Sequence, residues 1–118
     1  MLGVDLVKIS RIQAAVLRRG EAFLRRFLTQ SEREQFTTPQ SIAGIWAAKE
    51  ALSKALGCGI SGEFGFLDAC VFKDARGKPR VKFSPEFEAK FGKLTAQISI
   101  SHDSEYAIAV ATTSREIL

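Results

Sequence analysis

The stretch "WAAKEALSKALGCG", residues 46–59, decides the fold because it predicts the longest helix of the chain. We expect this helix to begin with Ser41 as its N-cap and to end at Gly57. Glu50 and Lys54 stand one helical turn apart. The spacing leaves two interpretations open: an ion pair on a solvated face, which stabilises a helix by about 0.2–0.5 kcal/mol, or part of a functional site.

The apolar residues of the helix indicate which of its faces is buried. Ile45, Leu52 and Leu56 fall on one stripe, which we expect to face the core. Glu50 and Lys54 project from roughly the opposite side of the helix. The polar pair is therefore predicted to point away from the core.

Small and aromatic residues border this polar pair. We expect Ala47 and Ala51 to form an exposed face that lets something large approach the helix backbone. Trp46 is expected toward the solvent-facing side of the helix, where a large aromatic side chain indicates an interface or the wall of a ligand-binding site. Both features favour the functional interpretation of the pair.

Outward from this helix, the chain predicts an α+β fold. The first half of the chain is expected to form a strand in residues 1–9, a helix from the N-cap Ser10 to Arg19 that Gly20 interrupts, and a short helix opened by a Thr29–Glu32 capping box. The second half is expected to form strands in residues 66–74 and 79–84 around a glycine turn, and then a helix from Pro85 to Gly92 capped by Ser84. Two final strands are expected in residues 95–101 and 106–113. No repeat, low-complexity segment or linker interrupts the pattern. Residues 1–118 are thus predicted to form one domain, with helices on one side of a mainly antiparallel sheet.

The composition of the chain indicates the cellular compartment and excludes some kinds of partner. The chain is 46% hydrophobic, without a run approaching the length of a membrane span, and its first ten residues alternate unlike a signal peptide. Cys58 and Cys70 lack the C-x-x-C spacing and the neighbours of a zinc site, and a disulfide framework is not expected. We expect a cytoplasmic protein with reduced thiols and no membrane partner.

The net charge of +4 comes largely from one segment, between Ser10 and Phe27, where Glu21 is the single acid. The basic residues of this segment are Arg11, Arg18, Arg19, Arg25 and Arg26. They imply an acidic partner. One alternative is a small basic nucleic-acid-binding module, but most of the nine phenylalanines occupy core-like positions and no aromatic-rich strand motif for stacking bases is present.

Asp5 lies mid-strand between apolar neighbours in "GVDLV", where an unpaired buried carboxylate would cost several kcal/mol, roughly 2–7 for a polar group. One interpretation is a salt bridge to Lys8 or Arg11. The other is a hard divalent cation shared with Glu50, because Mg²⁺ takes one or two protein carboxylates and completes its shell with water and substrate oxygens. Lys54 would then neutralise charge on a leaving phosphate. The spacing alone favours neither interpretation.

Five segments together resemble one known family. They are "GVDLVKISRI", "RRFLTQSE", "WAAKEALSKALGCGI", "GKP" and "SISHDSEYAIAVA", and they follow the order of the holo-acyl-carrier-protein synthases, the short bacterial phosphopantetheinyl transferases, over nearly the whole chain. The resemblance implies a 4′-phosphopantetheinyl transferase-like fold. It also implies transfer of the phosphopantetheine arm of coenzyme A to a serine of apo acyl carrier protein, releasing adenosine 3′,5′-bisphosphate, with no nucleic acid involved.

The resemblance assigns roles residue by residue. Asp5 and Glu50 are similar to the family's Mg²⁺ ligands, and Lys54 resembles its lysine at the diphosphate of coenzyme A. The residues that resemble its other coenzyme A contacts are Gly77, Lys78 and Pro79 near the nucleotide end, and Ser101 and His102 at a phosphate. The general base stays open among Glu50, a metal-bound water, or neither.

The resemblance also implies an assembly and a docking surface. Members form homotrimers with each site between two subunits, so Asp5, Glu50 and Lys54 would come from one chain and the Ser101–His102 strand from its neighbour. The five arginines named above would steer an acidic helix of the carrier protein. Many members carry an arginine at the place of Ile45, so one phosphate contact is missing here or is supplied by another residue.

The tripeptide Ser101–His102–Asp103 invites comparison with a hydrolase triad. On a strand, His102 points to the opposite face from Ser101 and Asp103, so the three side chains cannot form one hydrogen-bonded relay. The sequence therefore does not predict a hydrolase of this kind.

Overall fold

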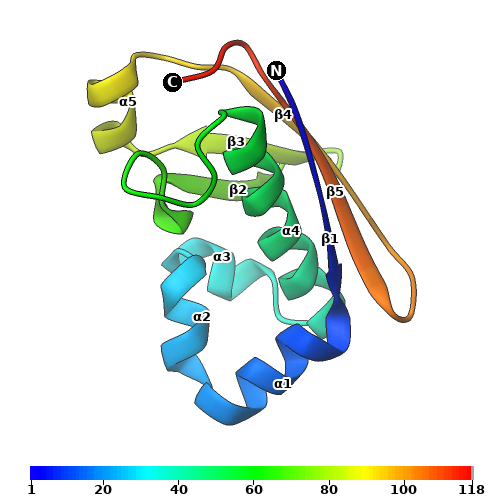
Figure 1. Cartoon of the computed structure of the whole chain (residues 1–118). Coiled ribbons are helices and arrows are strands. Elements are labelled where there is room, and N and C mark those ends of the chain that lie inside the picture. Colours follow the sequence, from blue (N-terminus) through cyan, green and yellow to red (C-terminus); the bar gives the residue numbers. More distant parts are fainter. Residues whose placement is uncertain (118) are drawn as a thin grey trace.

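The structure, a computed structural model that describes residues 1–117, places four helices between the first strand and the second, and a fifth helix between the third strand and the fourth (Figure 1). The strands are β1 (Leu2–Lys8), β2 (Ala69–Lys73), β3 (Pro79–Phe83), β4 (Ala96–His102) and β5 (Tyr106–Thr113). The helices are α1 (Ile9–Arg19), α2 (Glu21–Phe27), α3 (Gln30–Gln35), α4 (Pro39–Ala55) and α5 (Pro85–Phe91), with a 3-10 turn at Phe66–Asp68. The predicted α+β fold with antiparallel strands is confirmed.

Three strands form an antiparallel sheet in the order β1-β5-β4. The central strand β5 alternates strictly between buried and exposed residues, and its alanines at 107, 109 and 111 are buried. Helix α4 lies along this alanine face (Figure 1). The sheet thus has one covered face and two edges, β1 and β4.

Helix α4 is covered on more sides than the sequence indicated. Ala47 and Ala51 are fully buried, so the expectation that they form an exposed face is wrong. The physical reason is visible at Gly3 of β1, where an added Cβ would overlap the carbonyl oxygen of Ala51. Small side chains let the strand backbone lie directly on the helix backbone, and the space that we assigned to a ligand is filled by β1.

Two predicted helix starts are wrong by two or three residues. Helix α4 begins after Thr38, and Ser41 is its third residue, which completes a capping box with Thr38. Pro39 favours this earlier start because the first helical position needs no N–H donor. Helix α1 follows β1 without a side-chain cap, so Ser10 is not its N-cap. The predicted Thr29–Glu32 capping box of α3 is confirmed.

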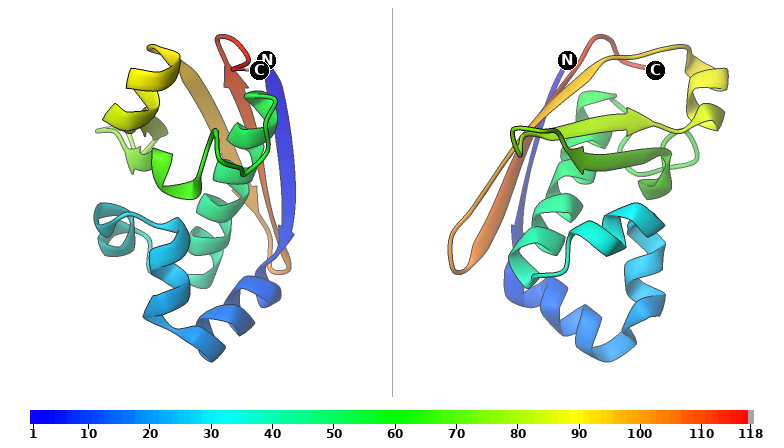
Figure 2. Two further views of the ribbon diagram at one scale, coloured as in Figure 1. Left: turned by 60° about the vertical axis from the view of Figure 1, so that its left-hand side comes forward. Right: turned by 180° about the vertical axis from the view of Figure 1, so that it is seen from behind.

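The predicted hairpin between residues 66 and 84 is confirmed as β2 paired with β3. Its turn is organised by Asp74, whose carboxylate accepts from the backbone N–H groups of Arg76 and Lys78. Gly77 adopts a left-handed φ of 78°, which glycine permits without strain. Figure 2 shows the tip of this hairpin beside β4. Ser84 caps α5 as predicted.

No helix within residues 1–117 is both long enough and apolar enough to cross a membrane.

Candidate functional site

The residues of α4 that remain open to solvent are few. Between Ile42 and Leu56, all are buried except Trp46, Glu50 and Lys54. These three are spaced four residues apart, so they share one line along the helix. The predicted polar pair therefore lies on the single stretch of α4 that a ligand can reach.

Asp5 of strand β1 lies beside this line of α4 residues. The Lys54 Nζ lies 3.0 Å from Asp5 Oδ1 and also donates to the carbonyl oxygen of Val4 at 3.0 Å. The cation that pairs with Asp5 is thus Lys54, and not Lys8 or Arg11, the partners in one of the two interpretations that the sequence left open. Lys54 reaches across to the strand because Gly3 brings β1 close to α4.

The electrostatics of Glu50 follow from this arrangement. Partial burial, then the charge of Asp5, raise the pKa of Glu50, and the charges of Lys54 and Arg11 oppose the rise. Two carboxylates from different elements therefore lie near enough to interact, and burial makes the charge of Glu50 unfavourable. Such a pair gains from a further cation.

This donor set fits a hard divalent cation. Residues 1–117 hold no cluster of three or more histidine, cysteine or acidic residues that would make an all-protein metal cage. Mg²⁺ commonly takes only one or two carboxylates and fills its octahedron with water and substrate oxygens. Asp5 and Glu50 could supply those carboxylates, with Lys54 holding one oxygen of Asp5.

Trp46 is half-buried in an aromatic cluster, which revises the expectation that it lies on the wet side of the helix. Its ring lies 5.0 Å from the ring of Phe27 and 4.8 Å from that of Phe66, measured between centroids. Phe23 completes the cluster at 5.9 Å. The cluster fixes α2 against α4, so Trp46 acts at least partly as core.

Three of the predicted coenzyme A residues meet in one pocket. Gly77 and Pro79 of the hairpin and His102 of β4 line a cavity of about 220 Å³, whose wall on α4 includes Ile45. Gly44 allows this approach, because a Cβ there would press on Ile100 of β4. Residues distant in the sequence are thus brought together beside the β4 edge.

The other three predicted coenzyme A residues, Lys54, Lys78 and Ser101, do not line this pocket. Lys78 lines a neighbouring hollow along β4 together with Ser99. Ser101 pairs with Ile108 in the sheet register and is exposed on the uncovered face. Asp103 accepts from two backbone N–H groups in the turn before β5, so it stabilises the turn and forms no relay with Ser101.

The two parts of the candidate site occupy opposite edges of the sheet. Asp5 lies on β1, while His102 lies on β4, and β5 runs between them. Figure 2 shows the hairpin tip at the β4 edge only. One chain therefore does not bring the carboxylates and the hairpin pocket against the same edge.

The five predicted docking arginines are all exposed. Three lie on α1 and two on α2, and the helices are separated at Gly20, whose φ is 55°. Arg25 pairs with Glu21 at 3.5 Å, on the surface. Arg11 is near enough to Glu50 to oppose the rise in its pKa. The basic surface thus extends to the carboxylate pair.

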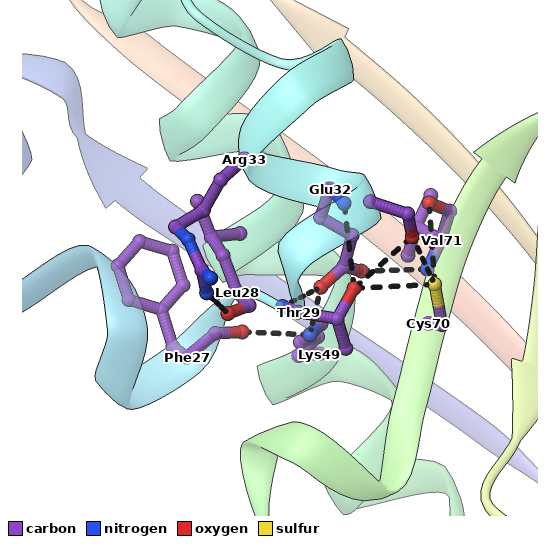
Figure 3. Close-up of polar contacts among 9 residues, drawn as sticks. Phe27, Leu28, Thr29, Glu32, Arg33, Lys49, Cys70 and Val71 are labelled. Atoms are coloured by element: carbon purple, nitrogen blue, oxygen red, sulfur yellow. Dashed lines mark hydrogen bonds and ion pairs between the residues drawn. The ribbon is translucent and has the colours of Figure 1, made fainter.

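The sequence analysis missed a buried ion pair next to the site (Figure 3). The Lys49 Nζ lies 2.7 Å from Glu32 Oε1 and 2.6 Å from the carbonyl oxygen of Phe27, and both charged side chains are fully buried. Glu32 also accepts from the backbone N–H groups of Thr29 and Val71. A signal was present, because Lys49 falls on the apolar stripe of α4, seven residues before Leu56.

The comparisons with known proteins agree with this arrangement. The profile of the 4′-phosphopantetheinyl transferase superfamily matches residues 1–111. A holo-[acyl-carrier-protein] synthase of Campylobacter curvus is 49% identical over 114 residues, which are 97% of this chain and 100% of that protein.

Solved structures extend the likeness to three dimensions. The crystal structure of the Helicobacter pylori holo-[acyl-carrier-protein] synthase in complex with coenzyme A superposes with a TM-score of 0.91 at 43% identity, covering 97% of this chain and 100% of that one. A holo-(acyl-carrier-protein) synthase from Bacillus anthracis, in complex with CoA (3′,5′-ADP), gives a TM-score of 0.80 at 36% identity, covering 95% and 93%. This chain therefore belongs to the 4′-phosphopantetheinyl transferase superfamily, among the holo-[acyl-carrier-protein] synthases.

Proposed function

We propose that this protein transfers the 4′-phosphopantetheine arm of coenzyme A to a serine hydroxyl of apo acyl carrier protein, in a Mg²⁺-dependent reaction that releases adenosine 3′,5′-bisphosphate. The observation that carries the proposal is the meeting of Asp5, Glu50 and Lys54 on the one open line of α4. The coenzyme A held by the Helicobacter pylori relative supports the choice of donor substrate.

The transfer depends on positioning of the two substrates and on charge neutralisation more than on covalent catalysis by the enzyme. Attack of a serine on a phosphoanhydride places charge on the departing phosphate. The half-exposed Lys54 ammonium donates to the Val4 carbonyl oxygen and to Asp5, and it would also donate to that phosphate. Mg²⁺, held by Asp5 and Glu50, would supply the remaining charge neutralisation.

The proposal includes a homotrimer that shares each site between two subunits. The outer face of the sheet supports it, because this face is apolar and uncovered in the single chain. Its exposed residues are Leu2, Val4, Leu6, Tyr106, Ile108 and Val110. A second copy against this face would cover it and bring the β4 edge of one chain beside the β1 edge of another.

Mixing two inactive variants tests this sharing directly. Glu50→Gln should inactivate the carboxylate half and His102→Ala should weaken the pocket half. Unfolding and refolding the two variants together should restore activity, because some mixed sites then combine an intact Glu50 with an intact His102. Activity of the mixture that only equals the average of the separate variants would place both residues in the site of one chain.

The basic surface on α1 and α2 is the proposed docking surface for the carrier protein. Reversing Arg18 and Arg25 to glutamate should raise KM for the carrier at least tenfold with little change in kcat, since rim charges act mainly on encounter. The wild-type KM should also rise with salt. A KM that neither salt nor the reversal alters would remove α1 and α2 from the docking surface.

The phenylalanines do not favour the nucleic-acid alternative. Phe23 and Phe27 belong to the cluster around Trp46, and Phe64, Phe83 and Phe87 form a second cluster. These rings pack on one another inside the protein, so they offer no platform for stacking bases.

The free thiols of Cys58 and Cys70 support the cytoplasmic location that forms part of the proposal.

The first experiment is an assay by intact mass. Purified protein is incubated with apo acyl carrier protein, coenzyme A and Mg²⁺, with an EDTA control. We expect the carrier to gain the mass of one phosphopantetheine only when metal is present. No gain, with the carrier verified as competent by an independent transferase, would reject the proposed function.

A further inference from the structure

Helix α4 buries a hydroxyl group that the proposed mechanism does not use. In this helix, which the structure describes throughout, the buried polar side chains are those of Lys49 and Ser53. Lys49 pairs with Glu32, whereas the Ser53 hydroxyl donates within its own helix, to the carbonyl oxygen of Glu50 at 2.6 Å. Ser53 therefore bonds to the backbone of one residue of the proposed site and directly precedes another, Lys54.

The Glu50 carbonyl oxygen also connects the two functional residues of α4. In an α-helix each carbonyl oxygen accepts from the N–H four residues later, so this oxygen accepts from the N–H of Lys54. The Ser53 hydroxyl meets that hydrogen bond at the same oxygen. A serine that bonds back to its own helix in this way often bends it. The hydroxyl therefore acts on the direction in which the last turn of α4 presents Lys54.

The same turn is fixed by two further sets of contacts. The carbonyl oxygen of Ser53 accepts from the N–H groups of Cys58 at 3.3 Å and Gly59 at 3.1 Å, which joins the end of the helix to the glycine turn. The Lys54 Nζ donates to Val4 and Asp5 of β1 at 3.0 Å each. Ser53 thus holds the turn from the buried side, and the Lys54 side chain holds it against β1.

The stability of the helix does not call for this hydroxyl. Alanine is the strongest helix former, and a serine that bonds back to its own helix slightly destabilises it. Alanines already fill the buried positions Ala48, Ala51 and Ala55 around Ser53. An alanine at position 53 would occupy the same site without the hydroxyl oxygen. The structural effect of the hydroxyl is therefore its contact with the backbone of Glu50.

We propose that Ser53 is a positioning residue for the transfer reaction. Its hydroxyl fixes the last turn of α4, so that the Glu50 carboxylate and the Lys54 ammonium keep the spacing that the metal and the departing phosphate require. The inference rests on the proposed function, which supplies both ligands. Because Ser53 is fully buried, it acts through the backbone of its neighbours and touches no substrate. It should therefore affect the rate more than the binding of coenzyme A.

The test removes the hydroxyl and keeps the backbone. We expect Ser53→Ala to lower kcat roughly tenfold, because a displacement of about 1 Å in a site can cost about 100-fold. KM for coenzyme A should change by less than about twofold. Without metal, the melting temperature should be unchanged or higher. The Mg²⁺ concentration that produces half of the full rise in melting temperature should increase about threefold or more, since metal binding to the folded state alone is stabilising.

Thr113→Val is the matched control. Thr113 is also buried, and its hydroxyl donates to the carbonyl oxygen of Ala55 at the end of α4, at 3.4 Å, and to that of Arg115 at 3.1 Å. This variant keeps the shape of the side chain and leaves the backbone of Glu50 and Lys54 untouched. It should lower the melting temperature and leave kcat and the Mg²⁺ dependence as in the wild type.

Two results would overturn the inference. One is a Ser53→Ala protein whose kcat and Mg²⁺ dependence equal those of the wild type. The other is an equal effect of Ser53→Ala and Thr113→Val on both quantities, because a merely structural hydroxyl would give this result. A wild type that transfers nothing would reject the proposed function instead, and the Mg²⁺ titration, which needs no carrier protein, would still decide the role of Ser53.

Discussion

Lys49 and Lys54 lie five residues apart on the same helix, and each is paired with a carboxylate from another element. The two pairs differ in their exposure to solvent. The Lys49 pair with Glu32 is completely buried. In the Lys54 pair with Asp5, the lysine side chain is 51% exposed and the aspartate 16%. The comparison shows that burial, which spacing along the helix does not reveal, separates the structural ion pair from the pair that we propose for function.

Every charged atom of the buried pair has a hydrogen-bond partner. Lys49 donates to Glu32 and to the carbonyl at the end of α2, and the two oxygens of Glu32 accept from Lys49 and from backbone groups of the α3 cap and β2. Desolvation by burial lowers the pKa of Lys49, and the charge of Glu32 opposes the shift. Both side chains are fully buried and out of reach of a substrate, so this pair joins α2, α3, α4 and β2.

Within residues 1–117, the open pair keeps one carboxylate oxygen of Asp5 without a protein partner. Lys54 donates to the other oxygen, and partial burial, then the charge of Asp5, raise the pKa of the neighbouring Glu50. Groups left in this state can exchange partners when a charged ligand arrives. The same helix therefore carries a structural lysine on the buried stripe and the lysine that we propose for catalysis on the open line.

The largest expected effect comes from breaking the buried pair. Lys49→Met should lower the free energy of unfolding by about 3–5 kcal/mol, since it leaves the Glu32 carboxylate buried without a cation. Denaturant titration measures this change. Adding Glu32→Gln, which keeps acceptors for the backbone N–H groups without the charge, should recover much of the loss. A double variant no more stable than Lys49→Met would show that the buried charge is not the cause.

The next effect comes from the open pair. Lys54→Met should reduce kcat about 100- to 1000-fold, as expected for loss of one group that stabilises developing charge. Its free energy of unfolding should fall by no more than about 1 kcal/mol, because exposed ion pairs contribute little. Steady-state kinetics and denaturant titration on one preparation measure both quantities. A Lys54→Met protein as unstable as Lys49→Met would erase the distinction between the two lysines.

The smallest expected effect concerns Glu50. Partial burial and the charge of Asp5 make its ionised form unfavourable, so neutral Glu50→Gln should raise the melting temperature slightly in EDTA. Added Mg²⁺ should raise the melting temperature of the wild type but not that of Glu50→Gln, because binding to the folded state alone is stabilising. Calorimetric scans with and without metal measure the difference. Equal stabilisation of both proteins by Mg²⁺ would remove Glu50 from the metal site.

Local sequence chemistry sufficed for much of the fold. The Thr29–Glu32 capping box, the Ser84 cap followed by Pro85, and the turn around Gly77 are decided by residues within a few positions of one another. The alternation of β5 follows in the same way from its own residues. Glu50 and Lys54 were also correctly expected on the less buried side of α4, because helical periodicity fixes which residues share a face.

What the sequence did not decide depends on contacts between distant elements. Ala47 and Ala51 look exposed in isolation and are buried only because Gly3 admits β1 to the helix surface. Lys49 falls on the apolar stripe of α4 in the sequence, but its partner is decided only when the fold brings Glu32 against it.

The sequence by itself therefore determined most of the elements, the caps of α3 and α5, and the polar line along α4, because these depend on local geometry. Only the tertiary structure decided that Lys54 pairs with Asp5, that Lys49 is buried, and that the carboxylates and the hairpin pocket lie at opposite edges of the sheet. The physical reason is that burial and ion pairing depend on which surfaces meet, and the residues that meet here are 17 and 49 positions apart in the chain.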